Sequence, residues 1–184
     1  VTSLAEARAR GVAEEHLIFI GHGAAAHEAD DFLHRDRFDR SAGMAATLAQ
    51  VMARNALTAE ALDLAELYSC FPCVPKLARR EIGWPLDRPA SVFGGLTLGG
   101  GPIGNYMSHA IASMVLALRD KGGTGLLYAN GGYATHNHAI PLSTQPFADV
   151  AFPHDFDVQP QADAIRGPIP PLAEDYVGSA TVET

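Results

Sequence analysis

Two glycine clusters divide the chain into stretches with different hydrophobic periods. The 184 residues include 18 glycines, which are densest from Gly94 to Gly104 and again from Gly122 to Gly132. Glycine clusters mark backbone that turns tightly or approaches a ligand. Before and between these clusters, segments with the hydrophobic period of a helix alternate with segments that have the period of a strand. This alternation predicts a layered α/β domain.

The periods and the turn residues place the expected elements along the chain. Helices are predicted over 3–9, 41–54, 73–83 and 105–120, and strands over 16–20, 61–68, 92–98, 125–130 and 133–142. Ser41 and Asn105 are expected to cap the helices that follow them. Residues 22–40 have no clear period, which predicts a surface loop. The domain is expected to cover residues 1–144.

The remainder of the chain is rich in proline. Prolines recur from Pro146 to Pro171 without a sustained hydrophobic period. Such composition predicts an extended linker over residues 145–184. The chain does not begin with Met, and it ends on the β-branched run GSATVET. We therefore expect both ends to be cut and the linker to lead to an absent C-terminal domain.

Composition and charge exclude several classes of partner. The chain has 13 Lys and Arg against 21 Asp and Glu, for a net charge of −8. This balance disfavours nucleic acid and anionic membranes, because both bind basic surfaces. No apolar run approaches the roughly 18 residues of a membrane-spanning helix. Two cysteines cannot form a disulfide framework and no signal peptide is recognisable, so a cytoplasmic location is predicted.

The motif Cys70-Phe71-Pro72-Cys73 stands between a predicted strand and a predicted helix. This is where a dithiol redox motif lies, because the start of a helix lowers the pKa of a thiol. A thioredoxin-like fold would place the motif near its first strand–helix unit, whereas here a strand, a loop and a helix precede it. The pattern favours two part-buried structural thiols over a dithiol redox module, which stays an alternative.

Histidines and glycines suggest two further kinds of site. His136 and His138 alternate on one face of a predicted strand, and His22, His27 or His154 could add ligands to a metal. No diagnostic ligand spacing accompanies them, so no metal is predicted. The Gly94–Gly104 loop lacks the Lys-Ser/Thr end of a P-loop and the spacing of a Rossmann turn, which disfavours a nucleoside triphosphate.

Three segments together carry a resemblance to a known family. They read AELYSCFP, GGLTLGGGPIGNYMSHAIASM and GLLYANGGYATHNHAI, over about residues 60 to 142. Their order and spacing resemble the last three signature blocks of the thiolase superfamily: an NEAF or HDCF block, a GG-x4-GHPxG block that opens a helix, and a C-x-G block in a hairpin. The closest likeness is to bacterial acetyl-CoA acetyltransferase-like proteins with an extra C-terminal domain. The resemblance implies the C-terminal half of a thiolase fold, a mixed five-stranded sheet with helices on both faces.

The chain departs from the thiolase blocks at three positions. Gly101 stands where thiolases have a catalytic histidine, and Ala129 stands where they have an acid/base cysteine. Tyr68 replaces the Asn or His that helps to hold the oxyanion water. The thiolase half that carries the nucleophilic cysteine has no counterpart here. We therefore expect the segment alone to be inactive, and the full-length protein to be an acyltransferase-like enzyme.

The resemblance implies chemistry at a coenzyme A thioester, which is a substrate rather than a covalently bound cofactor. His109 is predicted to be the acid/base or oxyanion group, with Tyr68 and Tyr106 beside it. The residues predicted to contact the substrate or CoA are Gly100, Gly101, Asn105, Asn130 and His136. The predicted partners are acyl-CoA, the missing N-terminal thiolase half and further copies of the chain in a homo-oligomer.

Other functions remain open besides acyl transfer in lipid metabolism. One is a thiolase-like aldolase that uses Tyr68 and Tyr106 as proton donor and acceptor. Another is an inactive module that binds CoA or lipid, which Gly101 and Ala129 favour. The third is the dithiol redox module.

Overall fold

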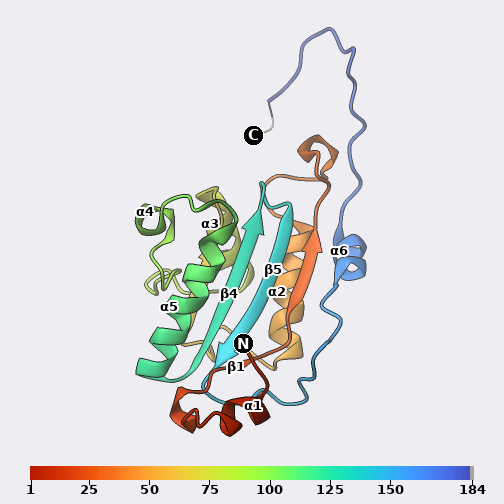
Figure 1. Cartoon of the computed structure of the whole chain (residues 1–184). Helices are drawn as coiled ribbons and strands as arrows, with labels where there is room; N and C mark the ends of the chain where they lie inside the picture. Colours follow the sequence, from red (N-terminus) through yellow and green to blue (C-terminus); the bar gives the residue numbers. More distant parts are fainter. Residues whose placement is uncertain (183–184) are drawn as a thin grey trace.

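A mixed sheet of five strands forms the centre of the molecule (Figure 1). The computed structural model describes residues 1–182. The strands are β1 (Phe19–Ile20), β2 (Ala24–His27), β3 (Leu64–Tyr68), β4 (Thr124–Gly131) and β5 (His136–Ser143). β3 and β4 are parallel, whereas β4, β1 and β2 all pair antiparallel with β5. The predicted α/β fold with a mixed five-stranded sheet is confirmed.

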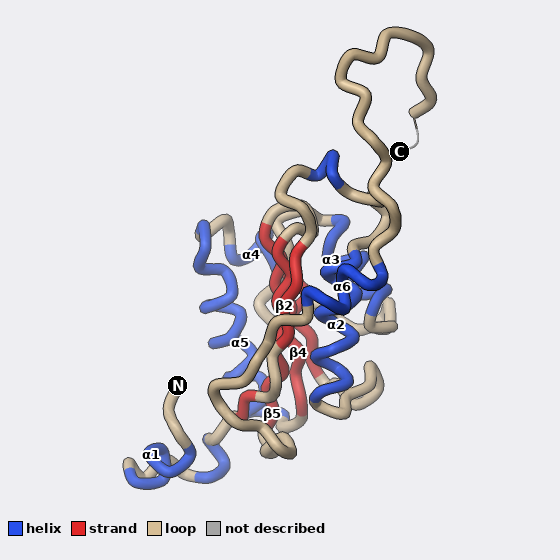
Figure 2. Tube along the Cα trace, turned by 90° about the vertical axis from the view of Figure 1, so that its right-hand side faces the viewer, coloured by secondary structure: helices blue, strands red, loops and turns tan. Residues whose placement is uncertain are grey.

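Helices cover both faces of the sheet, as Figure 2 shows edge-on. They are α1 (Leu4–Ala9), α2 (Ala42–Arg54), α3 (Cys73–Glu81), α4 (Gly95–Gly99), α5 (Tyr106–Lys121) and α6 (Gln159–Ile165), with short 3₁₀ turns at Glu14–His16, Phe32–His34 and Ile103–Asn105. α2, α3 and α6 lie on one face, and α4 and α5 lie on the other. None of the helices within residues 1–182 combines the length and apolarity needed to cross a membrane.

The α2 face contains the larger hydrophobic core. Ser41 caps α2 as predicted, because its Oγ accepts a hydrogen bond of 3.0 Å from the N–H of Met44. Met44, Leu48 and Val51 recur at helical spacing and are almost fully buried. They belong to one cluster with apolar side chains of β2, β3, β4, α3 and α6. This cluster joins the sheet to three helices.

On the opposite face, α5 packs against β4 through one line of side chains. Tyr106, Ala110, Met114 and Leu118 stand four residues apart and are buried. Gly125 of β4 lies directly beneath Met114, since a Cβ atom at this position would be 2.3 Å from the Met114 sulfur. A glycine at 125 therefore allows α5 to approach the sheet closely.

The strand predicted over 92–98 is wrong, because these residues form the turn that leads into α4. The N–H groups of Val92 and Phe93 donate to the buried carboxylate of Glu66, at 2.9 and 3.0 Å, instead of joining a strand. Gly94 and Gly100, on either side of α4, have φ angles of +99° and +64°. Such angles suit glycine and end the extended backbone.

The fifth strand is β2, which lies inside the predicted surface loop over 22–40. Ala24, Ala25 and Ala26 are all buried, and their strand pairs with Asn137 to Ala139 of β5. Three successive alanines show no alternation of apolar and polar residues, so the period gives no strand signal. The pairing partner lies more than 100 residues away along the chain, which explains why the strand was missed.

The predicted extended linker contains a helix that is part of the core. Val158 and Ala162, at the start and within α6, are fully buried against α2 and β2. Ala25 accepts a hydrogen bond from the N–H of Val158 at 2.9 Å and donates to the carbonyl of Phe156 at 2.8 Å. These bonds cover the open edge of β2. The segment is therefore not wholly extended, and the domain boundary at 144 remains a prediction.

Candidate functional site

A pocket of about 400 Å³ lies where β3 and β4 end and α5 begins. Ligands of open α/β sheets bind beyond the carboxyl ends of parallel strands, and β3 and β4 are the parallel pair of this sheet. The pocket is lined by Tyr68, Cys70, Leu96, Gly101, Ile103, Gly104, Tyr106, Met107, Asn130 and Gly131. Four predicted site residues thus come together here: Tyr68, Gly101, Tyr106 and Asn130. The lining does not include His109, Gly100, Asn105 or His136.

The two predicted tyrosines form a stacked pair. The rings of Tyr68, at the end of β3, and Tyr106, at the start of α5, are 3.8 Å apart between centroids and nearly parallel. Phe93 packs edge-on against Tyr106 at 5.2 Å. The aromatic cluster joins the strand end, the glycine-rich loop and the helix start. It fixes the wall of the pocket.

A buried carboxylate, which sequence reasoning missed, holds this wall together. Glu66 of β3 is completely buried and accepts a hydrogen bond of 2.7 Å from the hydroxyl of Tyr106. The hydroxyl of Ser91 lies 2.9 Å from both carboxylate oxygens and shares its one proton with them, and the N–H groups of Val92 and Phe93 donate as well. A buried carboxylate needs such donors to offset its lost hydration. An acidic residue in the middle of the otherwise apolar strand LAELY was the available signal.

Both phenols of the stacked pair keep their protons at neutral pH. Burial raises the pKa of the Tyr106 phenol well above its ordinary value, and the hydrogen bond to Glu66 raises it further. Burial also raises the pKa of Tyr68, with a smaller effect from the neighbouring Cys70. The two hydroxyls differ in their availability, however. The Tyr106 hydroxyl is bound to Glu66, whereas the Tyr68 hydroxyl has no hydrogen-bond partner among residues 1–182.

His109 lies one turn into α5 on the exposed side of the helix. Its ring stacks on Phe93 at 5.6 Å, and its Nε2 atom is 3.3 Å from the side-chain nitrogen of Asn105. Asn105 contacts this imidazole instead of capping α5, so the predicted side-chain cap is wrong. His109 and Asn105 therefore form a pair beside the pocket, outside its lining.

Asn130 is a buried anchor for the two turns around the pocket. Its Oδ1 accepts hydrogen bonds from the hydroxyl of Ser69 at 3.0 Å and from the N–H of Ala134 at 3.2 Å. Its Nδ2 donates to the carbonyl of His136 at 3.2 Å. The side chain thus links the end of β3 to the β4–β5 hairpin. Asn130 therefore lines the pocket, but its side-chain amide is already hydrogen-bonded to other residues of the protein.

The glycines of the loop leave open space beside α5. A Cβ atom added to Gly100, Gly101 or Gly104 would meet no atom within 4 Å. Gly101, which the sequence resemblance aligns with the histidine of the thiolase block, lies beside this open space. Gly101 lines the pocket, whereas Gly100 ends α4 outside it.

The predicted contact residue His136 lies on an exposed part of β5, opposite the lining residue Gly131 but outside the lining itself. Its Nε2 atom is 3.7 Å from a carboxylate oxygen of Asp30, and its ring centroid is 6.4 Å from that of His27. Burial lowers the pKa of the nearby His138, and the charges of His136 and His27 lower it further. Within residues 1–182, no group of three or more His, Cys, Asp or Glu side chains is arranged to hold a metal ion.

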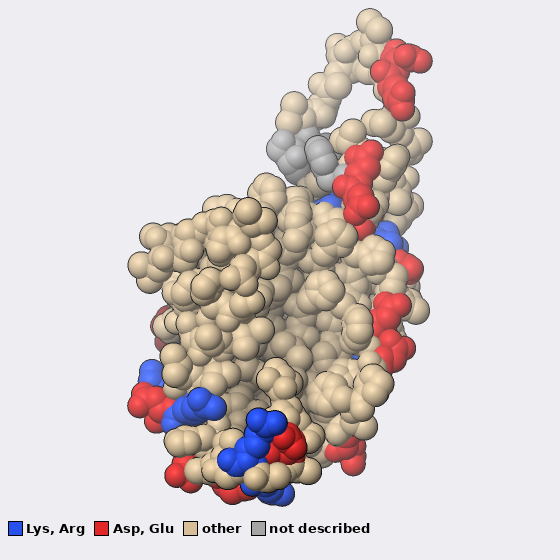
Figure 3. Space-filling view, viewed as in Figure 1, with Lys and Arg blue, Asp and Glu red and all other residues tan. Residues whose placement is uncertain are grey.

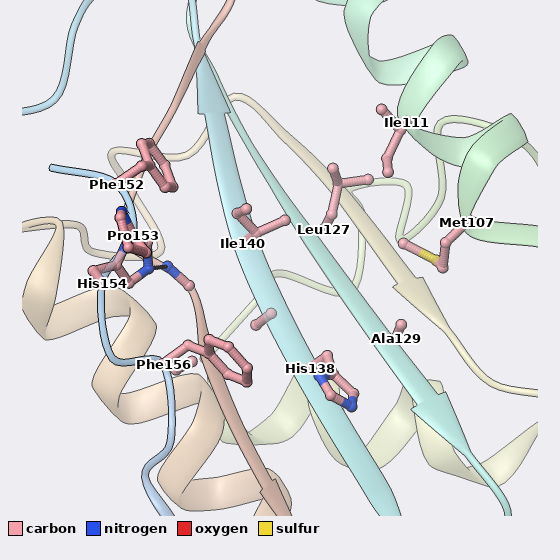
Figure 4. A pocket seen from close by; sticks show the side chains of 13 residues that line it. Met107, Ile111, Leu127, Ala129, His138, Ile140, Phe152, Pro153, His154 and Phe156 are labelled. Atoms are coloured by element: carbon pink, nitrogen blue, oxygen red, sulfur yellow. Dashed lines mark hydrogen bonds between the residues drawn. The ribbon is translucent and has the colours of Figure 1, made fainter. Parts of the chain in front are cut away.

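A second pocket, of about 520 Å³, forms an apolar groove on the same face of the sheet (Figure 4). It is lined by Gly23, Ala24, Met107, Ile111, Leu127, Ala129, His138, Ala139, Ile140, Phe152, Pro153, His154 and Phe156. Ala129, which the sequence resemblance aligns with the thiolase acid/base cysteine, lies on its floor. Met107 lines both pockets, so the two are neighbours beside α5.

Comparison with solved structures gives the class of fold. The chain is similar to a monomeric SCP2-thiolase like protein type 1 from Mycobacterium smegmatis, with 30% sequence identity and a TM-score of 0.78. It is also similar in fold to the peroxisomal 3-ketoacyl-CoA thiolase of Saccharomyces cerevisiae, with 18% identity, a TM-score of 0.52 and coverage of 69% of this chain and 34% of the yeast protein. No family model and no curated protein sequence matches the chain.

These likenesses confirm the resemblance that the three sequence blocks carry. The chain is a segment with the thiolase-superfamily fold. The match to the mycobacterial protein covers 90% of this chain and 37% of that protein.

Proposed function

We propose that the protein containing this chain binds an acyl-CoA thioester in the pocket at the ends of β3 and β4, and acts on a carbon–carbon bond next to the thioester. The observation that carries this proposal is the pocket itself. It opens at the start of the 16-residue helix α5, whose first N–H groups have no side-chain cap. Such groups stabilise a carbonyl oxygen on which negative charge develops.

Tyr68 is the side chain best placed to assist at that oxygen. The residue lines the pocket, and its hydroxyl has no internal partner within the described residues and stays protonated because burial raises its pKa. It would donate a hydrogen bond to the thioester oxygen as charge builds there. Gly101 and Gly104 leave room for the acyl group beside it. His109 stays a predicted acid/base group, with its imidazole outside the lining.

A CoA-thioester binder without turnover is the second candidate. Two observations favour it: Gly101 brings no imidazole into the pocket, and Ala129 brings no thiol to the neighbouring groove. The aldolase alternative requires two phenols that exchange protons. The Tyr106 hydroxyl is committed to Glu66, which leaves Tyr68 as the available phenol.

Binding and turnover of acetoacetyl-CoA by the full-length protein test these alternatives. We expect titration calorimetry to detect binding, and a spectrophotometric assay with free CoA to detect cleavage. Tyr68→Phe should lower turnover by about 10²-fold with little change in binding, because one proton donor is removed. The matched control is Tyr176→Phe, in the exposed C-terminal segment.

The outcomes separate the candidates. Binding without cleavage in the unaltered protein would support the binder and remove the enzymatic proposal. Absence of binding would remove both. Cleavage that is equally fast in Tyr68→Phe would exclude Tyr68 as the proton donor. His109 would then be the remaining predicted acid/base group.

A further inference from the structure

The two cysteines lie together at the edge of the candidate site. Cys70 follows β3 and lines the pocket, and Cys73 is the first residue of α3. Both are exposed and free. They are the only cysteines in the sequence. Neither thiol has a role in the proposed chemistry at the thioester oxygen.

The backbone between the cysteines is bent. Pro72 has helical φ and ψ angles of −61° and −22°, and the carbonyl of Phe71 accepts a hydrogen bond of 3.0 Å from the N–H of Val74. This bond closes a turn over residues 71–74, so Cys70 immediately precedes the turn and Cys73 lies within it. Only two residues separate the cysteines, which is the spacing of a dithiol motif at the start of a helix.

The turn is fixed to the rest of the fold on both sides. The hydroxyl of Ser69 accepts a bond of 3.1 Å from the N–H of Phe71 while it donates to Asn130. The Phe71 ring packs edge-on against Tyr133 at 5.4 Å. Burial, followed by the proximity of Cys73 and a hydrogen bond to it, raises the pKa of the Tyr133 phenol. Cys73 thus lies beside the Tyr133 phenol, whose hydroxyl donates to the carbonyl of Phe38, and it is the first residue of the nine-residue helix α3.

We propose that Cys70 and Cys73 form a thiol–disulfide exchange site for low-molecular-weight disulfides, and that it prefers the disulfide of coenzyme A because Cys70 opens into the pocket. In the first step, one cysteine thiolate attacks the disulfide, a mixed disulfide forms, and one CoA thiolate leaves. The second cysteine thiolate then attacks the protein sulfur and releases the second CoA thiolate. The protein is oxidised to the Cys70–Cys73 disulfide, its two thiol protons pass to solvent or to the released thiolates, and the CoA disulfide is reduced. Only the preference for CoA rests on the proposed function.

Intact-protein mass spectrometry of the reduced full-length protein tests the site. The parent protein keeps Cys70 and Cys73, and any other cysteine is replaced by serine. After incubation with glutathione disulfide, its mass should fall by two hydrogens, and no glutathione should remain attached. Cys70→Ser and Cys73→Ser should each retain one glutathione, because the resolving thiol is missing. Retention of glutathione by the parent protein without an internal disulfide would overturn the proposal.

A second arm compares CoA disulfide with glutathione disulfide at equal concentration. We expect oxidation by CoA disulfide to be at least about 10-fold faster, and Ile103→Glu at the pocket wall to abolish this preference through repulsion of the CoA phosphates. The matched control is Leu86→Glu, a similarly exposed apolar residue outside the pocket. Equal rates with an internal disulfide formed would overturn the CoA preference and count against CoA binding in the pocket. Failure to form the disulfide with either reagent would overturn the exchange site alone.

Discussion

The two faces of the sheet are built differently. On the α2 face, three helices enclose one continuous apolar cluster. On the α5 face, a single long helix covers part of the sheet, and the apolar groove stays open beside it. Figure 3 views this second face, where Lys, Arg, Asp and Glu gather near the rim and the central surface lacks them. The difference shows that one face is a closed core, whereas the other presents the pockets and is organised by polar contacts.

The largest expected effect tests whether stability comes mainly from the α2 face. Leu48→Ala removes a buried side chain of α2 and should lower the free energy of unfolding by about 2–5 kcal/mol. Leu116→Ala makes the same change on an exposed position of α5 and should cost within about 0.5 kcal/mol. Urea unfolding of both variants measures the contrast. Similar losses at the two positions would show that the α5 surface is packed.

The next prediction concerns the carboxylate that organises the α5 face. Glu66→Ala leaves the hydroxyls of Ser91 and Tyr106 and two backbone N–H groups without their acceptor, and should cost about 3 kcal/mol. Glu174→Ala, on the exposed C-terminal segment, is the control. Urea unfolding gives the stability, and near-ultraviolet circular dichroism reports the tyrosine stack. An unchanged spectrum and stability would show that Glu66 does not hold the loop.

A smaller effect should separate the two stacked tyrosines. Tyr106→Phe keeps the ring stack and removes one bond to the carboxylate, so it should cost about 1.5–3 kcal/mol. Tyr68→Phe removes a hydroxyl without an internal partner among the described residues and should cost within about 0.5 kcal/mol. Urea unfolding of the pair measures the difference. Equal losses would show that the Tyr68 hydroxyl has a partner too.

The smallest effect is the pH dependence that His138 confers on the open face. Burial lowers the pKa of His138 from its ordinary value of 6.5, so the folded state binds a proton less readily than the unfolded chain. Its contribution to stability is therefore present above pH 6.5 and is lost as the pH falls through the folded-state pKa. His138→Gln should flatten the stability profile between about pH 5 and 7. A parallel profile for His138→Gln would contradict this assignment.

The sequence was informative where its signals are local. Helix α2 begins after Ser41 as its capping residue predicts. β4 and β5 form the predicted hairpin, with Gly131 as the last residue of β4 and the turn over residues 132–135. The three sequence blocks identified the superfamily fold because their spacing reflects one strand end, one helix start and one hairpin. They also directed attention to Tyr68, Gly101, Tyr106 and Asn130, which line one pocket.

Local signals could not place features that depend on partners far along the chain. The side chain of Glu66 collects donors from residues 91 to 106, and no pattern within its own strand reveals them. For the same reason the sequence could assign His109 to α5 but could not predict that its imidazole lies outside the pocket lining.

Sequence by itself determined the periods, the cap of α2 and the order of the blocks, because these depend on neighbours within a few residues. Only the tertiary structure decided that β2 joins the sheet and that α6 closes the α2 core. It also decided that the Tyr106 hydroxyl donates to Glu66, whereas the Tyr68 hydroxyl has no hydrogen-bond partner among the described residues. These features arise from hydrogen bonds and burial between segments distant in the chain, whose energies exist only after the sheet has formed.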